Sequence, residues 1–423
     1  MWRPSVNGPA GWAKAILALV TAVAFVIGGV QLLPLAVPAA TWLVNASYNA
    51  FSSLQGPPVP VTTADFSGSG PGSLVTATTM PSVTQTLAGR NLRAVRVLYR
   101  STSGDTGSPT VVSGSVFTPL GEPPAGGWPV VAVGHGTVGI DGPCGPSLSP
   151  WLEGALSFVA PLVERGYAVS VADYEGLGVK GVHPYLDART AGLNMIDSVR
   201  ALRHAFPGQT STTWAAFGHS QGGAAAWAAN EQAGGYAPEL QLIGAVAAAP
   251  AADVTKFVDL AAAGMLSREQ RLSMPLIVES LARRHPDLDR DDFRSGVSAQ
   301  DWAVLTACQG SELMKRSAVA DKLTGSEFAP RTPEAAATLR KFLQQWALPQ
   351  RALSAPMSVW YGGADAYIDA EWTRAAIARA CAMGGTVTIE FQPGKGHSDV
   401  DLATQLQWLL DRFAGRPVHN DCR

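Results

Sequence analysis

The stretch Thr213–Ala233, TWAAFGHSQGGAAAWAANEQA, places a serine between glycines where a short apolar strand is followed by an Ala-rich helix. In the pattern G-x-S-x-G, Gly218 and Gly222 let the chain turn sharply enough to hold the hydroxyl of Ser220 clear of the sheet. Gly223 allows the helix to pack closely. This context predicts a nucleophile elbow in which Ser220 is the nucleophile.

Apolar strands alternate with helices on both sides of this elbow. The predicted strands are Trp128–Gly134, Tyr167–Ala172, Thr213–Phe217, Leu242–Ala249, Met357–Gly363 and Thr386–Gln392. The predicted helices are Gly154–Arg165, Asp187–Phe206 and Ser398–Phe413. Such alternation implies right-handed crossovers and a parallel sheet that is covered on both faces. The fold class is therefore α/β, and the alternating segments Leu92–Arg100 and Thr110–Thr118 add an antiparallel hairpin.

Residues 251–345 break this alternation, because they read as helical segments without a convincing strand. We expect an inserted helical cap here. Extra helices packed on the sheet edge, with no role in substrate access, are the alternative. The predicted organisation is a signal or anchor with a linker at 1–60, an α/β core at 61–250 and 346–423, and the cap at 251–345.

The N-terminus has basic residues followed by an uncharged apolar stretch, Ala15–Leu33. It predicts an export signal cleaved near Ala39 or Ala46, and retention as a membrane anchor is the rival reading. The Pro/Gly/Ser/Thr-rich segment Gln55–Pro81 is predicted to be a linker. The protein is therefore expected to be secreted or held at the cell envelope, where the apolar segment could associate with the membrane.

The overall composition limits the classes of partner. The 423 residues are 47% hydrophobic and 15% charged, enough for a large core, and the formal net charge is −2. Nucleic-acid binding is not supported, because phosphates require clustered Lys and Arg. No C-x-x-C motif or His/Cys cluster predicts a zinc site.

Four cysteines fit an oxidising compartment, where paired thiols persist. Three pairings can be drawn among them. We prefer Cys144 with Cys308 and Cys381 with Cys422. The first pair would tie a loop near the proposed site to the insertion, and the second would hold the C-terminal tail.

A serine nucleophile needs a histidine base and a carboxylate that orients the histidine. In this type of fold they follow in the order Ser, Asp or Glu, His, on loops after later strands. Asp365 follows the strand ending near residue 361, and His397 follows the strand ending near residue 391. Asp369 is a rival acid. His219, inside the elbow, is expected to be a supporting contact.

The tetrahedral oxyanion formed by attack on an ester needs preorganised hydrogen-bond donors. The backbone N–H of Gln221 is one expected donor. The second is expected from the loop GHGTVGIDGPCGPS, residues 134–147, where His135, Gly136 and Thr137 remain open as candidates. Asp173, at the end of an internal strand before the nucleophile, is expected to shape the pocket.

Several longer motifs occur together: GSLVTATTM (72–80), GHGTVGIDGPCGPS (134–147), VADYEGLG (171–178), GLNMIDSVRALR (192–203), GHSQGG (218–223), YGGADAYID (361–369) and GKGHSD (394–399). On these motifs the chain resembles the secretory lipase family of α/β-hydrolases over roughly residues 72–422. The resemblance implies the triad Ser220, Asp365 and His397, an oxyanion site at residues 135–137, a helical cap and two disulfides placed like the preferred pairs.

The resemblance also implies hydrolysis of acylglycerol esters, which we expect to proceed through an acyl-enzyme. This chemistry needs no metal or organic cofactor. Two other functions remain open. The same triad serves acyltransferases and peptidases, and a membrane-anchored binding protein could keep the scaffold after losing catalysis.

Overall fold

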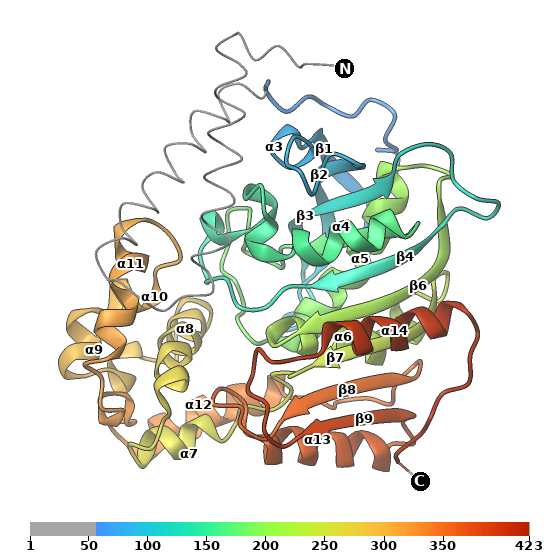
Figure 1. Cartoon of the computed structure of the whole chain (residues 1–423). Helices are drawn as coiled ribbons and strands as arrows, with labels where there is room; N and C mark the ends of the chain where they lie inside the picture. The colour runs from blue at the N-terminus through green and yellow to red at the C-terminus, as the bar shows by residue number, and fades with distance from the viewer. Residues whose placement is uncertain (1–55, 423) are drawn as a thin grey trace, which may run out of the picture. The chain divides into compact units, whose positions relative to one another are not determined.

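A nine-stranded sheet runs through the part of the chain that the computed structural model describes, residues 56–422 (Figure 1). The strands are β1 (Leu74–Thr79), β2 (Leu92–Thr102), β3 (Pro109–Pro119), β4 (Trp128–Gly134), β5 (Ala168–Ala172), β6 (Thr210–His219), β7 (Gln241–Ala248), β8 (Met357–Gly362) and β9 (Val387–Gln392). Their order in the sheet is β1-β2-β3-β5-β4-β6-β7-β8-β9. Strands β4 to β9 are mutually parallel, and β1, β2 and β3 join antiparallel at one edge. The predicted α/β fold with a mostly parallel sheet is confirmed.

Strand β1 corrects the prediction of a linker at Gln55–Pro81. It pairs antiparallel with β2, its Leu74 and Ala77 are buried, and the short helix α3 (Pro81–Thr84) follows it. An irregularity in the pairing between Leu74 and Thr76 breaks the regular two-residue alternation. The sequence of β1 therefore lacks the alternation of apolar and polar residues that predicts a strand, and pairing with β2 decides its conformation.

Helices cover both faces of the sheet. They are α4 (Leu156–Glu164), α5 (Ala188–Ala205), α6 (Gln221–Tyr236), α13 (Ala370–Ala382) and α14 (Leu402–Phe413). Alternate residues of β4 face opposite ways: Val130 and Ala132 pack with α5 and α6, whereas Val131 and Val133 pack with α4 and α14. Because both faces are buried, β4 and β5 are almost entirely apolar.

Six α-helices occupy the described chain between β7 and β8. They are α7 (Phe257–Ala262), α8 (Arg268–Arg284), α9 (Gly296–Gln300), α10 (Trp302–Thr306), α11 (Gly310–Ala320) and α12 (Pro333–Trp346). In Figure 1 these helices lie beyond the ends toward which the parallel strand arrows point. The helical content matches the sequence pattern, whereas the division into a core and a cap at residues 250 and 345 stays a prediction.

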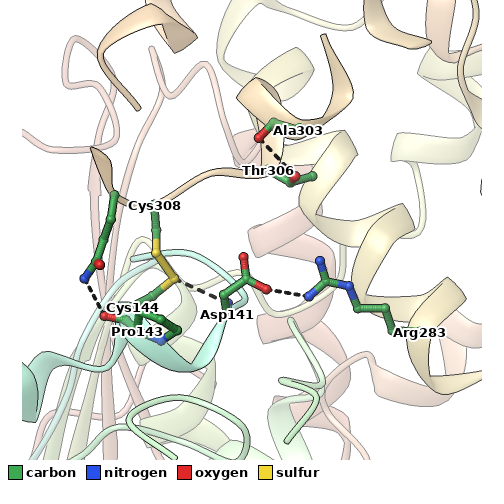
Figure 2. Close-up of a disulfide and its surroundings, with 8 residues drawn as sticks. Asp141, Pro143, Cys144, Arg283, Ala303, Thr306 and Cys308 are labelled. Atoms are coloured by element: carbon green, nitrogen blue, oxygen red, sulfur yellow. Dashed lines mark hydrogen bonds and ion pairs between the residues drawn. A yellow bond between two sulfur atoms is a disulfide. The ribbon is translucent and has the colours of Figure 1, made fainter. Parts of the chain in front are cut away.

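Two disulfides link segments that are far apart in the sequence. Cys144 bonds Cys308 with a Cα–Cα distance of 5.9 Å, and Cys381 bonds Cys422 with a distance of 5.2 Å (Figure 2 shows the first). The first joins the loop after β4 to the segment between α10 and α11, and the second joins α13 to the C-terminal tail. These are the two pairs preferred from the sequence. In the chain-entropy account, closing loops of this length removes about 4–5 kcal/mol each of unfolded-chain entropy.

The expected signal or anchor at Ala15–Leu33 and its cleavage positions, Ala39 and Ala46, lie outside the described residues. Within residues 56–422, no helix combines the length and the apolar character needed to cross a bilayer.

Candidate active site

The turn between β6 and α6 holds Ser220 in an unusual backbone conformation. Its φ of 59° and ψ of −121° are strained for a residue with a side chain. The glycines around it are required sterically: a Cβ on Gly218 would lie 1.9 Å from the carbonyl oxygen of Gly222, and one on Gly222 would lie 2.1 Å from that of Gly134. The backbone N–H of Ser220 donates to the carbonyl oxygen of Ala248 at 2.9 Å. Close packing of β4, β6 and α6 thus fixes the turn.

The side chains of Ser220, His397 and Asp365 form a continuous hydrogen-bonded chain. His397 Nε2 lies 2.9 Å from Ser220 Oγ, and His397 Nδ1 lies 2.7 Å from Asp365 Oδ2. The other carboxylate oxygen, Oδ1, accepts from the backbone N–H groups of Tyr367 and Ile368 at 2.8 and 2.9 Å. Since Nδ1–H donates to the carboxylate, the lone pair of Nε2 faces the serine hydroxyl. This is the arrangement in which the ring can accept the hydroxyl proton.

The three side chains meet because their loops leave the same edge of the sheet. Ser220 follows β6, Asp365 follows β8 and His397 follows β9, and these strands are parallel. The rival acid Asp369 is the N-cap of α13, where its Oδ1 accepts from the backbone N–H of Glu371 at 2.8 Å. Of the two acids, Asp365 is therefore the one in contact with the imidazole.

His219 supports the backbone that carries His397. Its Nε2–H donates to the carbonyl oxygen of His397 at 2.7 Å. Burial lowers the pKa of His219, which keeps its ring neutral near pH 7. The centroids of the two imidazole rings are 4.9 Å apart. This bond holds the loop after β9 against the elbow.

Two of the three open oxyanion candidates border the cavity next to Ser220. Gly136 and Thr137 line it, and a Cβ built on Gly136 would lie 3.8 Å from the Cβ of Ser220. His135 is buried, with its Nδ1 2.7 Å from the carbonyl oxygen of Gly136 and its Nε2 3.2 Å from that of Asp173. The imidazole of His135 thus supports the loop, and Gly136 lies beside the nucleophile.

Gln221 offers its backbone to the site and turns its side chain away. Its N–H is the first of α6, so no carbonyl within the helix can accept it. Its side-chain Nε2 donates to His183 Nε2 at 2.9 Å, and His183 Nδ1–H donates to the carbonyl oxygen of Glu175 at 2.8 Å. Burial lowers the pKa of His183 to about 3, so the ring is a neutral acceptor for Gln221. The hydrogen bond of the Gln221 side chain to His183 thereby holds the residue that follows the nucleophile in place.

Asp173 organises the loop after β4 without touching Ser220. It accepts hydrogen bonds from Ser113 Oγ at 2.5 Å, from Ser147 N at 2.8 Å and from Ser147 Oγ at 2.5 Å. Burial raises its pKa even though these bonds favour the ionised form. Its contacts connect β3, β5 and residues 134–147, the loop that contributes Gly136 and Thr137 to the cavity lining.

A cavity of about 500 Å³ adjoins the three contacting side chains. Its apolar lining comes from the core and from the helices between β7 and β8: Leu186, Ala251, Val254, Phe257, Leu272, Leu276, Leu313 and Ile368. The polar lining includes Tyr185, Ser273, Arg316 and Tyr367, none of which was predicted from the sequence. They lie in four separate segments that meet only in the fold, and only Tyr367 falls within one of the motifs quoted from the sequence. Within the described residues, no group of three or more His, Cys, Asp and Glu is placed to hold a metal ion.

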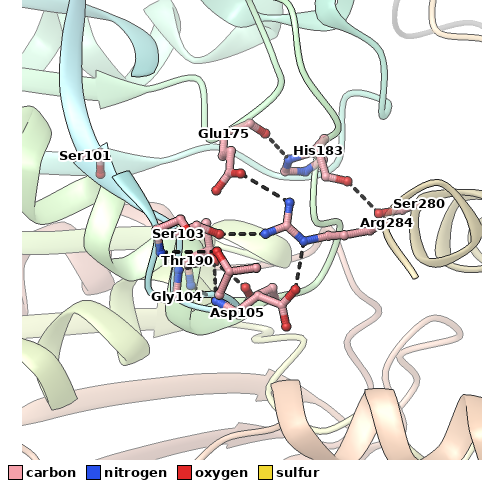
Figure 3. A network of polar contacts seen from close by, with 12 residues as sticks. Ser101, Ser103, Gly104, Asp105, Glu175, His183, Thr190, Ser280 and Arg284 are labelled. Carbon is pink, nitrogen blue, oxygen red and sulfur yellow. Dashed lines mark hydrogen bonds and ion pairs between the residues drawn. The ribbon is translucent and has the colours of Figure 1, made fainter. Parts of the chain in front are cut away.

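Arg284 joins the end of α8 to two loops of the core (Figure 3). Its guanidinium donates to Asp105 Oδ2 at 2.8 Å, to Glu175 Oε1 at 3.2 Å and to Ser103 Oγ at 2.6 Å. A second link runs from Ser280 Oγ to the carbonyl oxygen of His183 at 2.5 Å. These contacts fix the helix that forms one wall of the cavity.

Replacing Arg284 by Met is expected to lower the free energy of unfolding by about 3 kcal/mol at pH 7, because two half-buried carboxylates would lose their guanidinium partner. Burial tends to raise the pKa of Asp105, but its bonds to Arg284 and Trp346 bring the pKa below its ordinary value. In the wild type, Asp105 therefore contributes stability above the ordinary carboxyl pKa that is lost on acidification. The deficit of Arg284→Met should accordingly be full at pH 7 and shrink once the pH falls below the ordinary aspartate pKa of 3.8, toward the lowered pKa of Asp105.

Urea unfolding of the full chain across this pH range measures the effect. Arg268→Met is the matched control, since Arg268 pairs with Asp321 on the surface of the same helix, where an ion pair contributes less than about 1 kcal/mol. Equal losses in the two variants would contradict the role assigned to Arg284.

Fold and site together define an α/β-hydrolase scaffold that carries a serine, a histidine and an aspartate in mutual contact. The family model described as secretory lipase matches residues 152–421. The chain belongs to the secretory lipase family, as the resemblance in its motifs indicated.

Individual relatives agree with this assignment. The chain is 26% identical over 353 residues to a protein named "Probable inactive lipase MT1628" from Mycobacterium tuberculosis, covering 77% of this chain and 74% of the relative. It is 25% identical over 298 residues to Lipase 10 of Candida albicans, covering 63% and 60%. The crystal structure of Candida antarctica lipase A in its closed state superposes with a TM-score of 0.64 at 18% identity, over 86% of this chain and 87% of that one. At that identity the structural likeness supports the fold alone.

Proposed function

We propose that the protein is an exported serine carboxylester hydrolase that cleaves acylglycerol esters. The observation that carries the proposal is the contact of His397 with both Ser220 and Asp365, at 2.9 and 2.7 Å, beside a cavity of about 500 Å³. A cavity of this volume is typical of small-molecule sites. Membership of the secretory lipase family supports ester substrates of the lipid class.

In the first half of the reaction, Ser220 Oγ attacks the ester carbonyl carbon while His397 Nε2 takes the hydroxyl proton. Asp365 stays ionised and stabilises the imidazolium. The negative charge that develops on the carbonyl oxygen is held by the backbone N–H of Gln221 and by a donor from Gly136 or Thr137. Collapse of this intermediate breaks the bond to the alcohol, which leaves with the proton from His397.

In the second half, a water molecule replaces the alcohol. His397 removes a proton from the water, the resulting hydroxide attacks the acyl-enzyme, and Ser220 recovers its proton when the acid leaves. The apolar side chains of the cavity suit the hydrocarbon part of the acyl group, because binding there removes apolar surface from water. The helices of residues 251–345 would act as the cap over this cavity.

A second candidate is a binding protein that has lost catalysis. The observation that favours it is the name of the Mycobacterium tuberculosis relative, a probable inactive lipase. Against it stands the presence in this chain of all three chemical groups, at hydrogen-bonding distance and with the serine on a strained turn. Retaining such strain without a catalytic role has no evident benefit to the fold.

Labelling of the full chain with a fluorophosphonate separates the two candidates. The hydrolase predicts a covalent adduct on Ser220 and hydrolysis of 4-nitrophenyl esters and acylglycerols in a panel of rising chain length. Absence of both labelling and turnover would favour the binding protein. Adding an alcohol acceptor, and an amide substrate, to the panel tests acyl transfer and peptidase activity by the same triad.

Export is part of the same proposal. Two disulfides in the described chain fit an oxidising compartment, and the family is named for secretion. We propose that the N-terminal apolar segment directs this export, either as a cleaved signal or as a retained anchor.

A further inference from the structure

One cation that lines the cavity has no acidic partner in the part of the chain that the structure describes. Arg316, on α11, lines the same cavity as Ser220 and His397. Its Nη2 donates to the carbonyl oxygen of Leu272 at 2.8 Å, whereas its buried Nε–H has no hydrogen-bond partner among the described residues. An arginine that served only to join α11 to α8 would be expected to satisfy its buried donors.

Within residues 56–422, no carboxylate forms an ion pair with this guanidinium. The residues that line the cavity include no Asp or Glu, and residues 1–55, outside the described part, contain neither. On α8, Arg268 pairs with Asp321 and Arg284 pairs with Asp105 and Glu175. Arg271 of the same helix donates instead to the backbone carbonyl oxygens of Leu266 and Leu323. Arg316 differs from these three arginines because it lines the cavity and its buried Nε–H has no hydrogen-bond partner among the described residues.

The surroundings of Arg316 are polar but uncharged. The hydroxyl of Tyr185 lies 2.8 Å from Thr137 Oγ1, and Tyr185, Ser273 and Tyr367 line the cavity with Arg316. Burial raises the pKa of Tyr185 and of Tyr367, so both hydroxyls keep their protons near pH 7 and can donate. Burial also lowers the pKa of Arg316, but a guanidinium remains charged in proteins. A cation among neutral hydroxyl donors is a site for an anion.

We propose that the preferred substrates are esters that carry a second, anionic group, a carboxylate or a phosphate, and that Arg316 binds this group while Ser220 attacks the ester carbonyl. The inference rests on the proposed hydrolase function and narrows its substrate class. The anion takes no part in the covalent steps. The bound anion would hold the ester carbonyl next to Ser220. The anionic group can belong to the acyl portion or to the alcohol portion of the ester, and the experiment below distinguishes the two.

The test measures binding and turnover separately. Calorimetry with the Ser220→Ala full chain compares two pairs of esters. Monomethyl adipate, which carries its anion on the acyl portion, is compared with the neutral dimethyl adipate. 1-Butyrylglycerol 3-phosphate, which carries its anion on the alcohol portion, is compared with 1-butyrylglycerol. In at least one pair, the anionic ester should bind about 10- to 100-fold more tightly than its neutral counterpart. This is the ratio of dissociation constants expected for one charge-assisted hydrogen bond. The pair that shows the preference identifies the portion that carries the anion.

Arg316→Gln should abolish this preference, and Arg316→Lys should retain part of it, because the charge remains while the planar fork is lost. Lys315→Gln is the matched control: Lys315 is the adjacent cation, exposed and paired with Glu312 at 3.1 Å, and its loss should leave the ratio unchanged. Thermal unfolding midpoints verify that each variant is folded. Should Arg316→Gln fail to fold, Arg316→Lys and the Ser220→Ala ratios still decide the question.

Equal binding within both pairs, or a preference that survives Arg316→Gln, would overturn the anion site. The kcat/KM values of the chain with Ser220 intact, measured on the same four esters, address the proposed function. A binding preference without turnover of any ester would reject the hydrolase and leave the anion site standing. Turnover of all four esters at equal rates, with equal binding, would reject the anion site and support the hydrolase.

Discussion

Ser220→Ala is expected to reduce hydrolysis of 4-nitrophenyl butyrate to background, a loss of roughly 10⁵- to 10⁶-fold in kcat, as removal of a triad serine does in serine hydrolases. The substitution removes only Oγ, the atom 2.9 Å from His397 Nε2, and among the described residues no other hydrogen bond to this nitrogen is found. Release of 4-nitrophenol by the purified full chain measures the effect.

The fold should survive this change. Alanine keeps the Cβ that the strained turn already accommodates, and one partly buried hydrogen bond contributes about 1 kcal/mol. Circular dichroism and the two disulfides should therefore be unchanged, and fluorophosphonate labelling should disappear. Ser157→Ala, at an exposed serine of α4, is the control and should retain full turnover. Substantial activity in Ser220→Ala would remove Ser220 as the nucleophile.

Asp365→Asn is expected to lower kcat by about 10⁴-fold while leaving KM and stability close to the wild type. The amide oxygen can still accept from the backbone N–H groups of Tyr367 and Ile368. The amide nitrogen then faces His397 Nδ1 and donates to it, which forces the ring proton onto Nε2. In that tautomer the imidazole cannot accept the proton of Ser220. Steady-state kinetics with 4-nitrophenyl butyrate provide the measurement.

Asp369→Asn is the matched control, since it makes the same chemical change four residues away. Asp369 caps α13, and asparagine is an equally good N-cap, so neither activity nor stability should change appreciably. If Asp369→Asn lost activity and Asp365→Asn kept it, the assignment of the acid would be reversed.

Local sequence signals predicted those elements that carry their own pattern. The predicted strand Trp128–Gly134 coincides with β4, because a run of apolar residues between turn signals is typical of a buried parallel strand. By contrast, the composition of Gln55–Pro81 predicts a linker where β1 forms, and the sequence pattern predicts no helix at Ala370–Ala382, where α13 forms. Strand β1 has an irregular alternation, and its conformation depends on pairing with β2.

The serine, the aspartate and the histidine of the candidate site were also predictable, because the glycine spacing around the serine and the order of the three residues along the chain can be read from the sequence. Their spacing in three dimensions was not. Ser220 and His397 are 177 positions apart, and their contact depends on how β6, β8 and β9 lie in one sheet. The orientation of the Gln221 side chain toward His183, and the support of His397 by His219, likewise follow from packing.

The amino-acid sequence by itself determined the elbow, the alternation that makes a parallel sheet and the identity of the reactive groups, since these depend on residue type and short-range spacing. Only the tertiary structure decided which aspartate meets the imidazole, and that Arg316 lines the cavity with no acidic partner among residues 56–422. The physical reason is that hydrogen-bond geometry and charge pairing depend on distances of a few ångström between segments that the linear order leaves far apart.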